Sequence, residues 1–226
     1  MISSDFFLTS LNKYREKEGR ADFFPLASGL LDNGFRVEAN LLILATWNFA
    51  AFRYVTKTFH IDEFAQLLEK LEPTFASISG IGFKNARFED LREEIGLIYD
   101  HLSQIEGIKY TGASKLMHLK NPKLFVMWDS YIRGEDAKCR YKELPIVRSG
   151  DWPAKKYGKQ AESYIEFLSD VQDLFAHLQY DDQNKTLAKA IDEFNYVNIT
   201  LPLQDMKKAG RRDGVMRGTN GHSVTG

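Results

Sequence analysis

The chain has 226 residues, of which 43% are hydrophobic and 13% aromatic, enough to bury the core of one large domain or of two small lobes. Its one cysteine, Cys139, excludes an internal disulfide, a multi-cysteine zinc site and a four-cysteine iron–sulfur cluster. The net charge of −1 does not by itself favour avid binding to nucleic acid.

No signal peptide is expected, because the N-terminus lacks a basic region followed by a long apolar stretch. The most apolar segment, residues 37–55, is interrupted by Glu38, Asn40, Asn48 and Arg53, which predicts a buried helix and no membrane span. We therefore expect a soluble, cytoplasmic monomer that needs no membrane.

Apolar residues recur with helical spacing along most of the chain, strand-like alternation is nearly absent, and the predicted fold class is all-α. A basic loop is expected over 134–158, a short extended piece over 196–201 and a disordered basic tail over 207–226. Residues 1–206 would then form the folded part. The predicted helices span 3–19, 22–31, 37–54, 61–71, 88–103, 111–119, 164–178 and 187–194.

Positive charge is concentrated in two stretches, 109–160 with a net charge of +7 and 205–226 with +3. Such asymmetry is typical of a face that contacts phosphates, although a solvated basic surface is the plain alternative.

The stretch 105–133 contains the sequence pattern on which the functional prediction depends. It begins with a turn in which Gly107 is flanked by two isoleucines, and the turn opens the helix predicted over 111–119. The first N–H groups of such a helix have no partner within the helix, so they offer a site for a phosphate oxygen. Asn121 and Pro122 stop the helix, and an apolar run then delivers Asp129 to the start of another predicted helix.

This stretch resembles the helix-hairpin-helix DNA glycosylases, whose hairpin reads roughly Leu-Pro-Gly-Val-Gly-x-Lys-Thr-Ala. Residues 105–113 lie on that pattern without a gap, with Gly107 on the first hairpin glycine and Ala113 on the helix alanine. The distance to Asp129 agrees with the family's catalytic aspartate, and residues 129–133 look like the family's Asp-Thr-His-Val-Arg. The resemblance implies two helical lobes, a helix-hairpin-helix motif and a cleft between the lobes.

Two positions depart from the family pattern. Lys109 stands on the second hairpin glycine, and Thr111 stands where the bifunctional members carry a Schiff-base lysine. The resemblance therefore implies a monofunctional glycosylase. No cofactor or metal is expected, because the chain has one cysteine and its histidines show no metal-ligand spacing. Lyase chemistry would need Lys109 or Lys115 to reach the sugar from a shifted position.

The chemistry expected of Asp129 follows from the reaction. Hydrolysis of an N-glycosidic bond builds positive charge on the sugar, and a carboxylate near C1′ can stabilise that charge and activate a water. The alternative is that Asp129 only caps a helix. A flipped base also needs an aromatic pocket, and the residues proposed for it are Trp47, Asn48, Phe52 and Trp128. Trp47 as core and Asn48 as a structural amide remain the plain alternative.

The expected partner is double-stranded DNA with a flipped base. The residues expected to contact DNA are Gly107, Lys109, Gly112, Ala113, Ser114, Lys115 and Arg133. Two other functions stay open at this point: a nucleoside hydrolase on the same scaffold, and a helix-hairpin-helix DNA-binding module without catalysis. These residues do not specify which base is excised. They also do not distinguish a role in DNA repair from a role in defence against phages.

Overall fold

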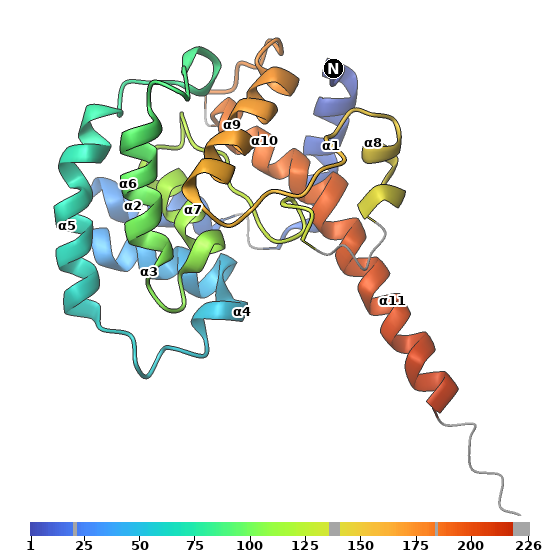
Figure 1. Cartoon of the computed structure of the whole chain (residues 1–226), viewed down its shortest axis with the longest axis horizontal. Helices are drawn as coiled ribbons and strands as arrows, with labels where there is room; N and C mark the ends of the chain where they lie inside the picture. The colour runs from blue at the N-terminus through green and yellow to red at the C-terminus, as the bar shows by residue number, and fades with distance from the viewer. Residues whose placement is uncertain (20–21, 136–140, 184, 219–226) are drawn as a thin grey trace, which may run out of the picture.

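A computed structural model describes the chain except residues 20–21, 136–140, 184 and 219–226; for 210–218 it describes the backbone alone. All regular elements of the described residues are helical and none is a strand, which confirms the all-α prediction (Figure 1). The α-helices are α1 (Ser4–Lys17), α2 (Phe23–Asp32), α3 (Arg36–Trp47), α4 (Phe49–Phe52), α5 (Ile61–Ser77), α6 (Arg92–Ser103), α7 (Lys109–Lys120), α8 (Pro145–Arg148), α9 (Ala161–Phe175), α10 (Leu187–Asn195) and α11 (Leu201–Gly218). Short 3-10 turns, η1 (Phe83–Asn85) and η2 (Tyr141–Glu143), and a π-helical segment, η3 (Tyr196–Thr200), complete the series.

Two helices begin at side-chain caps that the sequence supplies. The Ser3 hydroxyl accepts the N–H of Phe6 at the start of α1, and the Thr186 hydroxyl accepts the N–H of Lys189 at the start of α10. Each cap satisfies an N–H group that has no partner inside its helix. Both helices therefore have a fixed first turn, and both contribute side chains to the cavity described below.

The helix predicted over 37–54 is divided in the structure. α3 ends at Trp47, Asn48 leaves the helical conformation, and the short helix α4 follows. The Asn48 side chain bonds the turn before α7, a tertiary contact that periodicity cannot reveal. The end predicted for the helix over 61–71 is also wrong: α5 continues through Pro73 to Ser77, because Leu71 and Phe75 on either side of Pro73 are both buried in the core.

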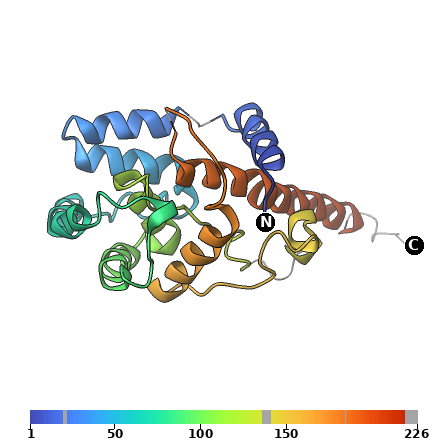
Figure 2. The same ribbon diagram turned by 90° about the horizontal axis from the view of Figure 1, so that it is seen from above.

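The C-terminal part differs most from the sequence prediction. Residues 196–200 form the π-helical segment η3 and not an extended piece, because burial of Ile199 and Thr200 overrides their preference for strands. The predicted disorder from Lys207 onward is wrong as far as Gly218, since α11 reaches that residue and extends away from the rest of the described chain (Figures 1 and 2). Residues 219–226 lie outside the described residues.

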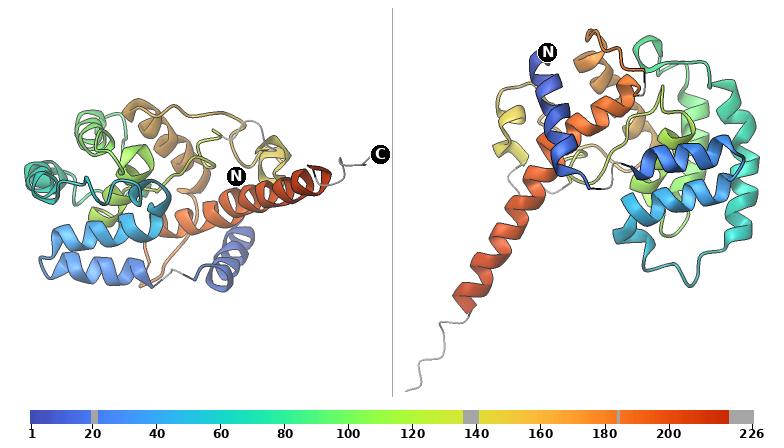
Figure 3. Two further views of the ribbon diagram at one scale, coloured as in Figure 1. Left: turned by 90° about the horizontal axis from the view of Figure 1, so that it is seen from below. Right: turned by 180° about the vertical axis from the view of Figure 1, so that it is seen from behind.

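Two groups of helices pack around one continuous hydrophobic core. In one group α2 packs on α3, α6 on α7, and α3 on α7; in the other, α1 packs on α10 and η3 (Figures 1 and 3). α9 lies against α6. No helix of the described chain is both long enough and apolar enough to cross a membrane. Nor do any three His, Cys, Asp or Glu side chains in these described ranges gather in a way that could hold a metal ion.

A candidate active site around Asp129

The turn between α6 and α7 has two residues in the left-handed region of backbone conformation. They are Gly107, with φ of +87°, and Lys109, with φ of +51°. A Cβ atom on Gly107 would lie 2.1 Å from a methyl carbon of Val55, so both the conformation and the space require glycine there. Lys109 adopts the unusual conformation without being glycine, at the position where the glycosylase hairpin has its second glycine.

α3 holds this turn in place through Asn48. Its buried side-chain amide donates to the carbonyl oxygens of Gly107 at 2.8 Å and Ile108 at 3.2 Å. Gly112 allows the approach, because a Cβ there would lie 2.9 Å from the Asn48 amide nitrogen. The turn is therefore fixed by the end of α3 and not only by its own sequence.

The first turn of α7 leaves N–H groups available. The N–H groups of Ile108 and Lys109 donate to the Ile105 carbonyl, whereas those of Tyr110 and Thr111 make no backbone hydrogen bond to a residue of the preceding turn. No side chain caps this end of the helix. Such an end favours an anionic group because of both its N–H groups and the helix dipole.

The chain between α7 and Asp129 is irregular and buried, and side chains from several helices satisfy its backbone groups. Tyr164 of α9 donates to the Val126 carbonyl at 2.8 Å. The Ser114 hydroxyl of α7 accepts the Trp128 N–H at 3.3 Å. A buried peptide group without a partner would destabilise the fold, so these bonds permit a non-helical segment inside the core. They fix Asp129 relative to α7.

The sequence predicted that Asp129 begins a helix, and this prediction is wrong. Asp129 instead caps a turn over 130–134. One carboxylate oxygen, Oδ1, accepts the N–H groups of Tyr131 at 2.8 Å and Ile132 at 2.9 Å. The other, Oδ2, accepts the Thr200 hydroxyl at 2.9 Å. Burial raises the pKa of Asp129 above its ordinary value, and these donors together with the charge of Lys115 oppose the rise.

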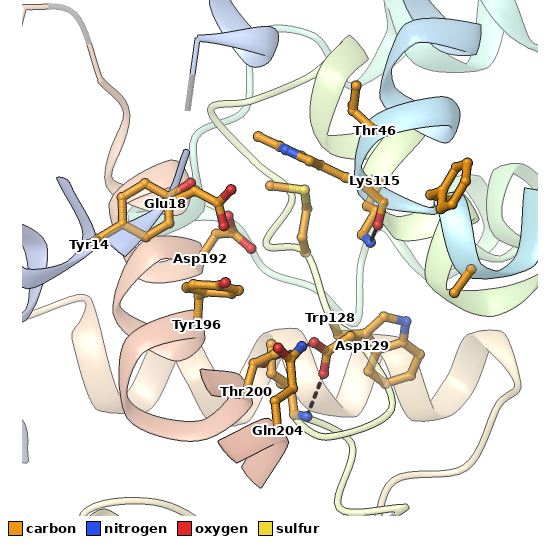
Figure 4. Close-up of a pocket in the computed structure, with 15 residues that line it drawn as sticks. Tyr14, Glu18, Thr46, Lys115, Trp128, Asp129, Asp192, Tyr196, Thr200 and Gln204 are labelled. Carbon is orange, nitrogen blue, oxygen red and sulfur yellow. Dashed lines mark hydrogen bonds between the residues drawn. The ribbon is translucent and has the colours of Figure 1, made fainter. Parts of the chain in front are cut away.

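Asp129 lies on the wall of a cavity of about 340 Å³, at the lower end of the size range of small-molecule sites. Figure 4 shows Asp129 and Thr200 on one side, with Lys115 and Thr46 on another and Tyr14, Glu18, Asp192 and Tyr196 facing them. The full lining comes from α1, α3, α4, α7, α10, η3, α11 and the Asp129 segment: Tyr14, Glu18, Thr46, Trp47, Phe49, Ala50, Lys115, Met127, Trp128, Asp129, Ile132, Asp192, Tyr196, Thr200 and Gln204.

Two residues of the wall near Asp129 are held by their own neighbours. The Lys115 ammonium group donates to the Trp47 carbonyl and lowers the pKa of Asp129 by its charge. The Trp47 indole is stacked on Phe24, with ring centres 5.8 Å apart and planes 4° apart, and the Lys189 ammonium group lies 4.6 Å from its ring centre. A cation and a parallel ring restrain the indole at the cavity wall.

Comparison of the chain with family models, with curated proteins and with solved structures finds no match. The resemblance to helix-hairpin-helix glycosylases therefore rests on residues 105–133. The geometry of the cavity does not depend on that resemblance, because it follows from the contacts given above.

The structure brings some of the proposed site residues together and separates others. Trp47, Trp128, Lys115 and Asp129 line one cavity. Asn48 and Phe52 do not line it: Asn48 bonds the turn before α7, and Phe52 packs against Phe59 with ring centres 5.2 Å apart. Asn48 therefore has the role given above as the alternative to a base pocket: its amide bonds another part of the protein.

Several residues proposed as DNA contacts are inside the protein. Arg133 is 0% exposed; it lies 4.1 Å from the ring centre of Tyr110, pairs with Glu135 and donates to the Gly158 carbonyl at 2.7 Å. A side chain so enclosed cannot reach a phosphate. The other enclosed members of the proposed set are Gly107, Gly112, Ala113 and Ser114, while Lys109 is exposed and Lys115 partly exposed.

Much of the cavity wall comes from residues that the sequence did not single out. Tyr14 and Glu18 belong to the end of α1, and Asp192, Tyr196, Thr200 and Gln204 lie far along the chain in α10, η3 and α11. No motif marks them. Their only sequence signal is a polar or aromatic residue inside an amphipathic helix, which is also what an ordinary surface position shows.

Proposed function

We propose that this protein is a DNA glycosylase that hydrolyses the N-glycosidic bond of a damaged or modified base, with Asp129 as the catalytic carboxylate. The observation that carries the proposal is the position of Asp129 on the wall of a cavity lined by aromatic rings. The neighbouring residue Trp128 connects this segment to the start of α7, because its indole N–H donates to the Tyr110 carbonyl at 3.1 Å. Its cap bonds are compatible with this role, because they occupy Oδ1, while Oδ2 accepts a hydrogen bond from the Thr200 hydroxyl.

In the proposed reaction a base leaves the DNA stack and enters the cavity, so that C1′ of its sugar lies at Asp129. The bond between C1′ and the base nitrogen breaks and its electron pair leaves with the base. The carboxylate stabilises the positive charge that develops on the sugar, and a water oxygen attacks C1′. Asp129 accepts the proton of that water, and the released base takes up a proton.

The proposal assigns α6 and α7 to a helix-hairpin-helix motif that holds the DNA backbone. The available N–H groups of Tyr110 and Thr111 and the exposed Lys109 support this assignment, since all three are at the start of α7. The cavity would be the cleft between two lobes, one formed by α2–α7 and the other by α1 and α9–α11. Phe49, which is 55% exposed and lines the cavity, is placed to fill the space that a departing base leaves in the stack.

The deciding experiment compares the wild type with Asp129→Asn on a panel of genomic and phage DNAs, with released bases identified by mass spectrometry. Asparagine keeps an oxygen that can accept the Tyr131 and Ile132 N–H groups, so the variant should fold. We expect DNA binding to persist and base release to fall by about 10²–10⁴-fold. Asp90→Asn, which changes an exposed aspartate that forms a surface ion pair with Arg87, is the matched control and should release bases normally.

The same experiment separates the two other functions. A nucleoside hydrolase would release bases from free nucleosides and would not need duplex DNA. A binding module without catalysis would bind DNA with a steep salt dependence in both proteins and release no base. Normal turnover by Asp129→Asn would contradict the assignment of the catalytic residue.

A further inference from the structure

The short helix α4 and the turn after it expose two aromatic rings and a guanidinium group next to the cavity. Phe49 is 55% exposed and lines the cavity, Tyr54 is 73% exposed, and Arg53 is exposed as well. We call these three residues the α4 ridge. Single apolar residues are common on protein surfaces, whereas rings that gather with a cation form a surface on which a planar partner can stack.

The three side chains of the ridge contact one another. The guanidinium carbon of Arg53 lies 4.5 Å from the ring centre of Tyr54 and 5.6 Å from that of Phe49, and a guanidinium N–H donates to the Tyr54 hydroxyl. These contacts restrict the rotamers of long side chains before any partner arrives. A planar group that stacks on them therefore orders less of the protein on binding.

Buried neighbours hold the ridge against the turn before α7. Phe52 and Val55, which alternate with the exposed residues, are buried. A Cβ atom on Gly107 would lie 2.1 Å from a methyl carbon of Val55 and 3.6 Å from a ring carbon of Phe52, so both side chains pack on that turn. The ridge thus has a fixed support that extends from the cavity to the turn that contains the exposed Lys109.

The charge around the ridge favours a polyanion. Residues 48–61 contain Arg53 and Lys57 and no Asp or Glu. The adjoining turn exposes Lys109 together with Glu106, so three cations stand against one carboxylate. Rings interleaved with cations are typical of surfaces that bind unpaired nucleotides, because the rings stack on the bases and the cations attract the phosphates.

We propose that the α4 ridge is a stacking surface for unpaired bases, so that the protein binds DNA with unpaired bases more tightly than a fully paired duplex. A paired duplex buries the faces of its bases inside the stack, whereas an unpaired base presents a face to the Tyr54 ring and the Arg53 guanidinium group. The inference rests on the proposed function for its partner, DNA, but it does not depend on hydrolysis.

The test measures, by fluorescence anisotropy, the affinity for three labelled DNAs of equal length: a single strand, a paired duplex, and a duplex with unpaired bases at its centre. We expect the wild type to bind the duplex with unpaired bases at least roughly five-fold more tightly than the paired duplex, and Tyr54→Ala to lose most of this preference. Tyr54→Phe keeps the ring and should keep the preference.

The salt dependence separates stacking from charge. Tyr54→Ala removes no charge, so the slope of log binding constant against log salt concentration should stay at the wild-type value. Arg53→Ala should lower the affinity and also reduce this slope by about one. The matched control is Phe35→Ala, which removes a ring 52% exposed at the other end of α3 and should keep the wild-type preference.

The outcomes distinguish the ridge from the glycosylase. Equal wild-type affinity for the two duplexes, or a preference that persists in Tyr54→Ala, would overturn the ridge. A loss in Phe35→Ala as large as that in Tyr54→Ala would overturn it as well. A preference that depends on Tyr54, in a protein that releases no base, would support the ridge and contradict the glycosylase. Base release without any such preference would do the reverse.

Discussion

Replacement of Asn48 by alanine tests whether the end of α3 holds the turn before α7. The change removes two buried hydrogen bonds, to Gly107 at 2.8 Å and to Ile108 at 3.2 Å. The Ile108 carbonyl keeps a second partner, the N–H of Gly112, whereas the Gly107 carbonyl has no other hydrogen bond to a described residue. A lost bond costs about 0.5–1.5 kcal/mol and an unpaired buried carbonyl about 1–3 kcal/mol, so we expect a loss of roughly 2–4 kcal/mol.

In a chain of this length such a loss lowers the Tm by roughly 4–16 °C, which scanning calorimetry measures directly. DNA affinity, measured below the new Tm, should also fall, because the turn would no longer be fixed. Asn198→Ala is the control: it removes bonds to Ser10 and Phe194, far from the turn in sequence, and should lower the Tm without changing DNA affinity. Asn48→Asp, which sets a carboxylate against two carbonyl oxygens, should be no more stable than Asn48→Ala. A wild-type Tm in either Asn48 variant would refute the reasoning.

Three further predictions concern the site. The raised pKa of Asp129 predicts that base release falls in acid, with a midpoint above the pH at which an ordinary aspartate titrates, and that Lys115→Gln moves this midpoint still higher. A midpoint that Lys115→Gln does not change would count against the interaction of the two residues. Because the raised pKa costs the wild type stability as the pH rises through it, Asp129→Asn should gain stability over the wild type in that range. Lys109→Glu should weaken binding to every duplex and reduce by about one or more the slope of log binding constant against log salt concentration. Lys13→Glu on α1 is the exposed control and should leave this slope unchanged. An unchanged slope in Lys109→Glu would show that Lys109 does not contact phosphate. Borohydride should trap no covalent complex with DNA, and an adduct that disappears in Lys115→Ala would instead identify Lys115 as a Schiff-base lysine.

The local features of this protein could be predicted from the sequence because they depend on neighbouring residues. Helical spacing located most of the helices and the all-α class, and Gly107 marked a turn whose left-handed conformation the structure contains. The aspartate at 129 was expected near that turn, since it lies 20 positions after Lys109 and a single helix separates the two. Caps and turns are set by the residues that form them.

The cavity, in contrast, was decided by tertiary packing. Asn48 and Arg133 looked available in the sequence, yet one bonds the turn and the other is enclosed by Tyr110, Glu135 and Gly158. Tyr14 and Thr200 come from the two ends of the chain, and they line one cavity with Asp129 because α1 packs on α10 and η3. Local sequence sets the backbone of a segment, but which side chains share a cavity depends on how distant helices bury their apolar faces together.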